Sequence, residues 1–476
     1  MLFNSLSFAF FFPIVTVLYF ILPHNLRWVF LLVASSVFYV FFIPKYILIL
    51  FFLIIVDYSA GILIENARGR KRKFFLILSI IANCLILFAF KYFNFFADSV
   101  GNLAKLIHWN YSLETLSLIL PIGLSFHTFQ SMAYTIEVYR GKQKSERNIG
   151  IYSLYVMFYP QLVAGPIERP QNLIHQFYEK HYFEYKRITE GLKLMLWGLF
   201  KKIVIADRAA LIVDQVYNNV YDYQGLSLII ATVLFAFQIY CDFSGYSDIA
   251  IGSAQVMGFK LMKNFNQPYL SKSISEFWHR WHISLSTWFR DYLYIALGGS
   301  RVSRPHWYFN LFITFLVSGL WHGANWTFVI WGALNGFYIV FSVWTKKLRE
   351  KILNLFRIAQ IPVALNSLRI IVTFSLTCIA WVFFRANSVK DAFYILVNIF
   401  GGFSYAIFTN FKFDILVVFF AVFFIEVTDY LRRNKKLEFS YLNKYPGLRW
   451  IFYYILIFGI LLFGEISRKP FIYFQF

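Results

Sequence analysis

A long apolar stretch without a charged residue runs from Leu311 to Val343 and holds one histidine, His322, near its middle. A single membrane span needs roughly 20 residues, so this stretch is too long for one span. It predicts two helical pieces broken near Gly319 and Gly323, with His322 at the break. Irregular backbone at membrane depth is tolerated only where it is buried in protein or lines a water-filled cavity. An ionisable side chain there is a functional-site hypothesis. The alternative is a structural histidine bonded to a neighbouring carbonyl.

Composition extends the membrane assignment to the whole chain. Of its 476 residues, 59% are hydrophobic and only 14% are charged, which is more apolar surface than a soluble domain can keep from water. We expect an all-α, polytopic transmembrane protein of about 11 or 12 spans, forming one domain over residues 1–476. Apolar runs supporting this count lie near 6–22, 28–43, 46–64, 74–90, 117–136, 190–205, 226–241, 308–320, 324–344, 369–384, 413–428 and 450–464. Shorter runs near 150–164, 245–258 and 391–408 are expected to be re-entrant or interfacial.

The net charge of +21 comes from clusters in short loops between the apolar runs. Such clusters mark cytoplasmic loops and can contact anionic lipid head groups, so the charge does not indicate nucleic acid. Counting spans from these loops places both chain ends outside the cytoplasm, and the first residues lack the basic region of a signal peptide. The clusters are Arg68, Arg70, Lys71, Arg72 and Lys73; Arg140, Lys142, Lys144 and Arg147; Lys346, Lys347, Arg349, Lys351 and Arg357; and Arg432, Arg433, Lys435 and Lys436.

Residues 271–300 predict an unusual helix. Small hydroxyl residues followed by Glu276 are typical of a helix start, the pattern continues from Phe277 to Leu297, and Gly298-Gly299 is a plausible stop. The segment mixes tryptophan and tyrosine with charged residues, which is wrong for a span facing lipid. It suits a helix at the interface or dipping into the protein.

His279 and His282 are three residues apart and would share one face of that helix. With His322 they would make three metal ligands, but histidine ligands need a second shell and no suitable carboxylate is evident. Histidines at the interface beside tryptophan are a second interpretation. The functional interpretation pairs His282 with His322 across a cavity, one as general base and the other orienting substrate or stabilising charge, since histidine titrates near working pH.

Several other segments carry weaker signals. The three prolines and one glycine of Pro160–Pro170 predict a fixed turn near the membrane surface, and the following residues 166–189 predict an interfacial or cytoplasmic helix. Asp242 and Asp248 follow an apolar run and could bind a cation, cap a helix or face the cavity; helix capping and hydrogen bonding are favoured for them over catalysis. The cysteines, at positions 84, 241 and 378, lie in apolar runs and are expected to be buried and unpaired.

Taken together, several long strings resemble the bacterial membrane-bound O-acyltransferase (MBOAT) family, of the alginate and peptidoglycan O-acetyltransferase type. The resemblance runs essentially from end to end, and the strings occur in one order. They are Pro160–Arg169, Asp242–Ala250, Asn264–Tyr269, Glu276–Tyr294 with Gly298-Gly299, Ser318–Trp326, Trp381–Arg385 and Phe471–Phe476.

The resemblance implies many helices around a central tunnel, a catalytic histidine at His322 and a second at His282, with no metal or cofactor. His279 stands where an arginine is expected in relatives, which weakens the metal interpretation. Acetyl-CoA is the expected donor: His322 acts as base toward an acceptor hydroxyl, and His282 aids positioning or charge stabilisation. Candidate residues of the tunnel are Trp321, Asn325, Trp326, Trp281, Arg290 and Asp291.

The resemblance also implies a place in the bacterial cytoplasmic membrane and an extracytoplasmic SGNH-type partner that passes the acetyl group to a polysaccharide. Phe471–Phe476 is either a docking element for that partner or an interfacial anchor of aromatic rings. Two alternatives stay open: D-alanyl transfer to teichoic acids, and a transporter or flippase, although no inverted repeat of the transporter kind is visible.

Overall fold

The computed structural model describes residues 1–109, 114–163, 165–355, 360–402, 406–433, 446–465 and 471–474. Within these ranges the chain is helical and contains no strand, which confirms the all-α prediction. Arg357, Lys435 and Lys436 of the predicted basic loops lie outside the described residues. The first half contains α1 (Leu6–Ile21), α2 (His24–Val40), α3 (Ile47–Asn66), α4 (Arg70–Leu87), α5 (Phe93–Leu106), α6 (Leu124–Tyr139), α7 (Ile149–Met157), α8 (Tyr159–Leu162), α9 (Pro170–Leu173), α10 (Tyr185–Phe200) and α11 (Asp207–Asn218).

The second half begins with the longest described helix, α12 (Leu226–Met257). Three π-helical segments, Phe88–Tyr92, Lys201–Ala206 and Arg290–Tyr294, join or extend helices in the described chain. The remaining helices are α13 (Ile274–Arg280), α14 (Ile283–Phe289), α15 (Arg304–His322), α16 (Trp326–Trp344), α17 (Lys346–Leu355), α18 (Pro362–Arg385), α19 (Val389–Asn398), α20 (Ala406–Arg433), α22 (Pro446–Phe463) and the 3-10 turn η9 (Ile472–Phe474).

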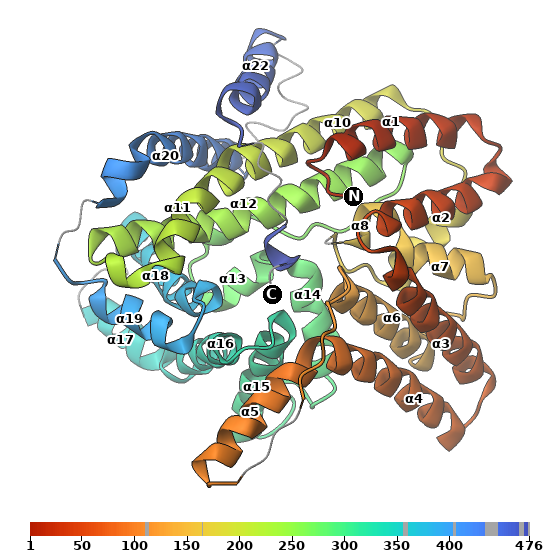
Figure 1. Cartoon of the computed structure of the whole chain (residues 1–476), viewed down its shortest axis with the longest axis horizontal. Coiled ribbons are helices and arrows are strands. Elements are labelled where there is room, and N and C mark those ends of the chain that lie inside the picture. Colours follow the sequence, from red (N-terminus) through yellow and green to blue (C-terminus); the bar gives the residue numbers. More distant parts are fainter. Residues whose placement is uncertain are drawn as a thin grey trace.

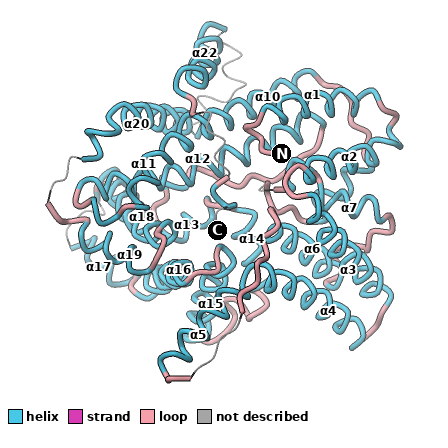
Figure 2. The backbone as a smooth tube through the Cα atoms, viewed as in Figure 1, coloured by secondary structure: helices cyan, strands magenta, loops and turns pink. Residues whose placement is uncertain are grey.

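Six helical segments of the described chain are long and apolar enough to cross a membrane, so this is a multi-pass membrane protein. They are Pro44–Asn66, Arg70–Leu106, Leu226–Met257, Trp326–Trp344, Pro362–Arg385 and Pro446–Phe463, and the shorter α1 and α2 are also apolar. The larger predicted count of spans stays a prediction. Figure 1 shows the helices arranged around a centre in which the last described residues lie, while α5 and α22 project at the edges. The backbone tube shows how little of the described chain is loop (Figure 2).

Glycines let the central helices approach closely. A Cβ atom on Gly198 of α10 would lie 2.5 Å from the carbonyl oxygen of Gly245 in α12, and one on Gly191 would lie 2.8 Å from that of Gly252. Small residues at such contacts are the usual way that membrane helices pack. Gly245 therefore does not break the helix, and the predicted separate re-entrant piece at 245–258 is wrong, because it continues α12.

Three further predictions fail. The helix expected from Phe277 to Leu297 is broken at Trp281 and His282, where α13 ends and α14 begins. As predicted, Gly298 and Gly299 end the segment, with φ of 100° and 59°. Residues 166–189 form only short turns before α10 starts at Tyr185, because prolines and extended residues interrupt them. Of the cysteines, Cys241 and Cys378 are buried, whereas Cys84 is exposed on α4.

Charged side chains that the apolar pattern concealed pair inside the helix bundle. Lys202 Nζ lies 2.8 Å from a carboxylate oxygen of Asp207 and 2.8 Å from one of Asp242. Lys201 lies 2.5 Å from Asp248 and donates to Ser244 at 3.0 Å. Asp242 and Asp248 thus form ion pairs from the middle of α12 rather than capping a helix. A buried charge needs such partners, because desolvation costs several kcal/mol for each ion.

Replacing Lys202 by Met should unfold the protein at a lower temperature, because it leaves Asp207 and Asp242 without their shared cation. Breaking a buried ion pair on one side costs about 3–5 kcal/mol. Thermal unfolding in detergent measures the loss. The exposed Lys186→Met at the start of α10 is the control and should change little. Equal unfolding temperatures for both variants would contradict the role given to Lys202.

Candidate active site

The break predicted inside the long apolar stretch separates α15 from α16. His322 is the last residue of α15, and Gly323 continues in extended conformation with φ −162°. Asn325 then caps α16, since its side chain accepts a hydrogen bond from the Thr327 amide at 3.0 Å. A Cβ atom on Gly323 would meet the ring of Phe328 at 2.2 Å, so only glycine fits the turn. The structure therefore confirms the break and places His322 at it.

His322 lies in a chamber of aromatic rings and is 3% exposed. Its ring centroid lies 4.9 Å from those of Trp321 and Trp331, 5.4 Å from Phe384 and 5.6 Å from Tyr473. The rings exclude bulk water from the imidazole. Such surroundings strengthen any electrostatic interaction with a group that reacts there.

His282 is buried in the same chamber and holds an uncommon backbone conformation. Its φ of 42° and ψ of 55° are left-handed, which is rare for a residue other than glycine. Asn264 supports the turn: its backbone oxygen accepts the Ile283 amide at 2.9 Å, and its side-chain oxygen lies 3.4 Å from His282 Nδ1. Strained backbone of this kind persists where the surroundings fix it, often at functional sites.

The end of the described chain lies between the two histidines. The Tyr473 ring centroid lies 5.6 Å from that of His322 and 6.4 Å from that of His282. Phe471 and Ile472 are 1% and 2% exposed, and the Ile472 amide donates to Asp242 at 2.9 Å. Docking element and interfacial anchor are therefore both wrong for Phe471–Tyr473, because this tail is buried in the site. Gln475 and Phe476 lie outside the described residues.

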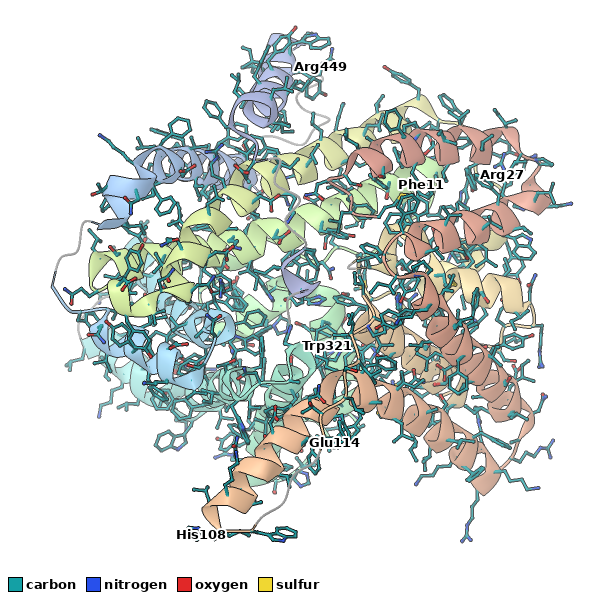
Figure 3. The ribbon with its side chains drawn as sticks, viewed as in Figure 1. Phe11, Arg27, His108, Glu114, Trp321 and Arg449 are labelled. Carbon is teal, nitrogen blue, oxygen red and sulfur yellow. The ribbon has the colours of Figure 1, made fainter. Side chains whose placement is uncertain are left out.

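The predicted tunnel residues divide into two groups. Trp321 is buried beside His322, and its label lies near the centre of the molecule in Figure 3, far from Arg449 and His108 at the edges. Trp281 is buried in the aromatic wall, 5.0 Å from Trp381. By contrast, Asn325 acts as a helix cap. Trp326 is 54% exposed and packs on Phe95 of α5, so neither joins the chamber.

Arg290 and Asp291 lie apart from the chamber, in the π-helical segment after α14. They bond to each other at 2.7 Å, and this bond raises the pKa of Arg290 above its usual value. Arg140 also donates to the Asp291 carbonyl at 2.8 Å, and Arg169 approaches its carboxylate at 3.7 Å. Arg290 thus stays charged at the edge of a cavity described next.

Two cavities flank the end of α15. A small cavity of about 60 Å³ is lined by His322, Tyr473, Lys91, Gly123 and Ser125, among others. A large, mainly apolar cavity of about 470 Å³ lies between α13–α14 and α15–α16, with Arg290 and Tyr294 in its lining. Its lining also includes Trp278 and Ser318. Ser318 is one helical turn before His322, and the ring centroids of Trp278 and Trp331 are 5.7 Å apart.

The arrangement does not gather metal ligands. Across the described ranges, no group of three His, Cys, Asp or Glu side chains could hold a metal ion. The break at Trp281 separates His279 from the face of His282, and His279 is bonded to the Ser275 carbonyl at 2.6 Å. The two remaining histidines are suited to proton transfer and hydrogen bonding.

Sequence reasoning missed two residues of this site, Tyr473 and Lys91. Tyr473 lies more than 100 residues from either histidine along the chain, so no local pattern connects them. Lys91 follows directly on an apolar run, and a charge inside a span is itself a functional signal. That signal could have identified Lys91.

Both histidines of the site fall within a region shared with known proteins. The model of the MBOAT, membrane-bound O-acyltransferase, family matches residues 147–383, a range that includes both histidines. The probable alginate O-acetylase AlgI of Pseudomonas aeruginosa is 40% identical over 395 residues, covering 82% of this chain and 73% of that protein. The peptidoglycan O-acetyltransferase of Helicobacter pylori is 36% identical over 440 residues, covering 84% and 80%. The teichoic acid D-alanyltransferase of Bacillus subtilis is 26% identical over 57% of this chain and 70% of its own length.

We expect the hydrogen bond from the Ile472 amide to Asp242 to hold the tail, Phe471–Tyr473, in the chamber. In a chain whose native cysteines are replaced by alanine, Ile472→Cys should resist a water-soluble maleimide, because the side chain is buried. Adding Asp242→Ala should accelerate labelling about tenfold or more by allowing local opening. Lys105→Cys, at an exposed position of α5, serves as the rapidly labelled control. If the Ile472→Cys variant were labelled as fast as the Lys105→Cys variant with Asp242 still in place, the tail would not be buried.

Proposed function

Because the chain belongs to the membrane-bound O-acyltransferase family, we propose that it moves an acetyl group across the membrane. The donor is cytoplasmic acetyl-CoA, and the final acceptor is a hydroxyl of an extracytoplasmic polysaccharide. The observation that carries this proposal is the chamber in which His322 and His282 face Tyr473. O-acyltransferase activity follows from the family, while the donor, route and acceptor are the proposal.

In the proposed reaction, His322 accepts the proton of an acceptor hydroxyl while the oxygen of that hydroxyl adds to the thioester carbonyl carbon. The tetrahedral intermediate then collapses, the carbon–sulfur bond breaks, and the CoA thiolate takes the proton back from the imidazole. His282 orients the reacting groups and stabilises charge, and its left-handed turn bound to Asn264 fixes its position. General base catalysis of this kind contributes about 10²–10⁴-fold.

The large cavity supports the proposed donor route. Its lining is mostly apolar, it is large enough for a slender acyl-thioester chain, and Arg290 lies at its edge. Arg140, Lys142 and Lys144 follow α6 near that end. Clustered positive charge attracts an anionic donor such as CoA, an effect that weakens with salt.

The helix directions support the proposed orientation. Basic residues gather at the start of α4, after α6 and at the start of α17, and such clusters mark the cytoplasmic side. α15 and α16 pack antiparallel. The loop that connects them, beside His322, therefore lies at the opposite end of the pair from the basic start of α17, which follows α16. With this orientation both chain ends belong to the outer half of the protein, where Phe471–Tyr473 are buried in the chamber, and the small cavity is taken to open toward that side.

A partner on the outer side completes the proposal. We infer an extracytoplasmic SGNH-type protein that receives the acetyl group at the small cavity and passes it to alginate, peptidoglycan or another exopolysaccharide. The polysaccharide acceptor is supported by the alginate O-acetylase and the peptidoglycan O-acetyltransferase, which this chain matches over most of its length. The teichoic acid D-alanyltransferase matches less of the chain at lower identity, so D-alanyl transfer is the weaker candidate. A transporter has no support from these relatives.

His322→Ala should lower transfer of labelled acetyl from acetyl-CoA by about 10²–10⁴-fold in inside-out vesicles that contain the partner, because the general base is lost. His282→Ala should also reduce transfer. The matched control is His306→Ala, which removes an exposed histidine at the start of α15 that lines neither cavity. Transfer that survives in the His322 variant would refute the mechanism. If the intact protein did not consume acetyl-CoA, the proposal that acetyl-CoA is the donor would be refuted.

Filling the large cavity should obstruct the donor. Thr314→Trp places an indole into the cavity lining and should raise KM for acetyl-CoA about tenfold or more, with a smaller change in kcat, since it removes binding rather than the reacting groups. Val372→Trp, on an exposed face of α18, is the control for bulk. Unchanged KM in the Thr314 variant would mean that the donor enters elsewhere.

A further inference from the structure

The ammonium of Lys91 reaches the end of α15 from another part of the chain. It belongs to the π-helical segment between α4 and α5. Its Nζ donates to the carbonyl oxygen of Trp321 at 2.7 Å and to that of His322 at 3.0 Å. Both hydrogen bonds of this partly buried lysine therefore go to the backbone that carries the proposed general base.

The end of α15 needs donors because its last carbonyls have no partner within the helix. These carbonyls also carry partial negative charge from the helix dipole, which favours a cation. The neighbouring Tyr92 hydroxyl meets the same need at the Leu320 carbonyl with a bond of 2.9 Å. A neutral donor thus suffices for that position, so capping alone does not require a charged residue at position 91.

Withdrawing a full charge from water is costly unless something offsets it. In the described part of the chain, no carboxylate lies within ion-pair distance of Lys91. This contrasts with Lys202, which has two carboxylates. For Lys91 the two carbonyls of α15 and the negative end of the helix dipole offset the cost of burying the ammonium, and no neighbouring carboxylate of the described chain neutralises its charge.

That charge faces the small cavity. An ammonium has three N–H donors, and the two carbonyls of α15 account for two of them. Lys91 lines the cavity together with His322, Tyr473, Gly123 and Ser125. A negatively charged oxygen formed beside His322 would meet the ammonium without further movement of the protein.

We propose that Lys91 is a further catalytic residue, whose ammonium stabilises the negative charge that develops on the acyl carbonyl oxygen. The inference rests on the proposed function. As the acceptor oxygen adds to the carbonyl, the electron pair of the carbon–oxygen double bond moves onto that oxygen, beside Lys91. When the carbon–sulfur bond breaks, the double bond re-forms. Lys91 keeps its protons throughout, and its bonds to α15 hold it at a fixed distance from His322.

The test compares Lys91→Met with Lys91→Gln in the full chain, using labelled acetyl-CoA in vesicles with the partner present. Both variants remove the charge, but Gln keeps a donor for the α15 carbonyls. We expect each to lower kcat about 100-fold, the size of loss found when one donor to a developing oxyanion is removed, with KM for acetyl-CoA within about threefold. Thermal unfolding in detergent is measured on the same preparations.

Tyr92→Phe and Lys105→Met are the controls. Tyr92→Phe removes a bond to the same helix end without changing charge, and Lys105→Met removes an exposed charge from the adjoining α5. Both should keep kcat within about fivefold of the unmodified protein. If Tyr92→Phe loses as much as Lys91→Met, or Gln restores kcat, the charge is unnecessary and the proposal is overturned.

The other possible results of this experiment also decide whether the proposal for Lys91 holds. If the Lys91→Met variant keeps more than about a tenth of the kcat of the unmodified protein, the loss is smaller than that expected from removing an oxyanion donor, and the proposal is overturned. Unfolding of both Met and Gln variants identifies Lys91 as a structural cap and overturns it too. His322→Ala, run beside them, separates the two levels: transfer that needs His322 but not Lys91 refutes this inference alone. No acetyl transfer by the unmodified protein refutes the proposed function and this inference with it.

Discussion

The site depends on one constraint, which is that a helix ending inside an apolar bundle must find partners for its last carbonyls within the protein. α15 ends at His322, and the carbonyls of its last turn are bound by Lys91 and Tyr92. Asn325 meets the corresponding need at the start of α16. Because both helix ends are satisfied by side chains, the break is rigid. The imidazole of His322 thus lies at a helix end whose carbonyls are bound by side chains from another segment of the chain.

The same requirement explains the charges inside the bundle. Lys202 is stabilised by Asp207 and Asp242, and Asp242 in turn accepts the amide of Ile472. The ion pairs therefore do more than neutralise one another, because one of the carboxylates fixes the tail that brings Tyr473 to the histidines. Packing of α10 on α12 through glycines brings these charges within reach of one another.

Local signals predicted those parts of the structure that local physics determines. Apolar content indicated membrane helices, the glycines around His322 indicated the break, and Gly298-Gly299 ended their segment as expected. The failures at the site involve partners distant in sequence. The aromatic pattern from Phe277 onward suits one helix, yet Asn264 draws the backbone into a left-handed turn at His282. The aromatic tail suits an interface, yet Asp242 holds it inside the protein.

The positions of the two cavities bear on how one site can serve two sides of a membrane. The lining of the large cavity includes Ser318 and Trp278, and that of the small one includes His322 and Tyr473. The ring of Trp331 contacts both Trp278 and His322. In the proposed reaction the bulky, charged part of the donor does not pass these packed rings. Its thioester carbonyl reaches His322 with the sulfur still attached, and the carbonyl carbon leaves the sulfur only after it has bonded to the acceptor oxygen. Transfer at a fixed histidine would therefore move the acyl group without moving its carrier, and the barrier against leakage would be the same aromatic packing that holds the histidine.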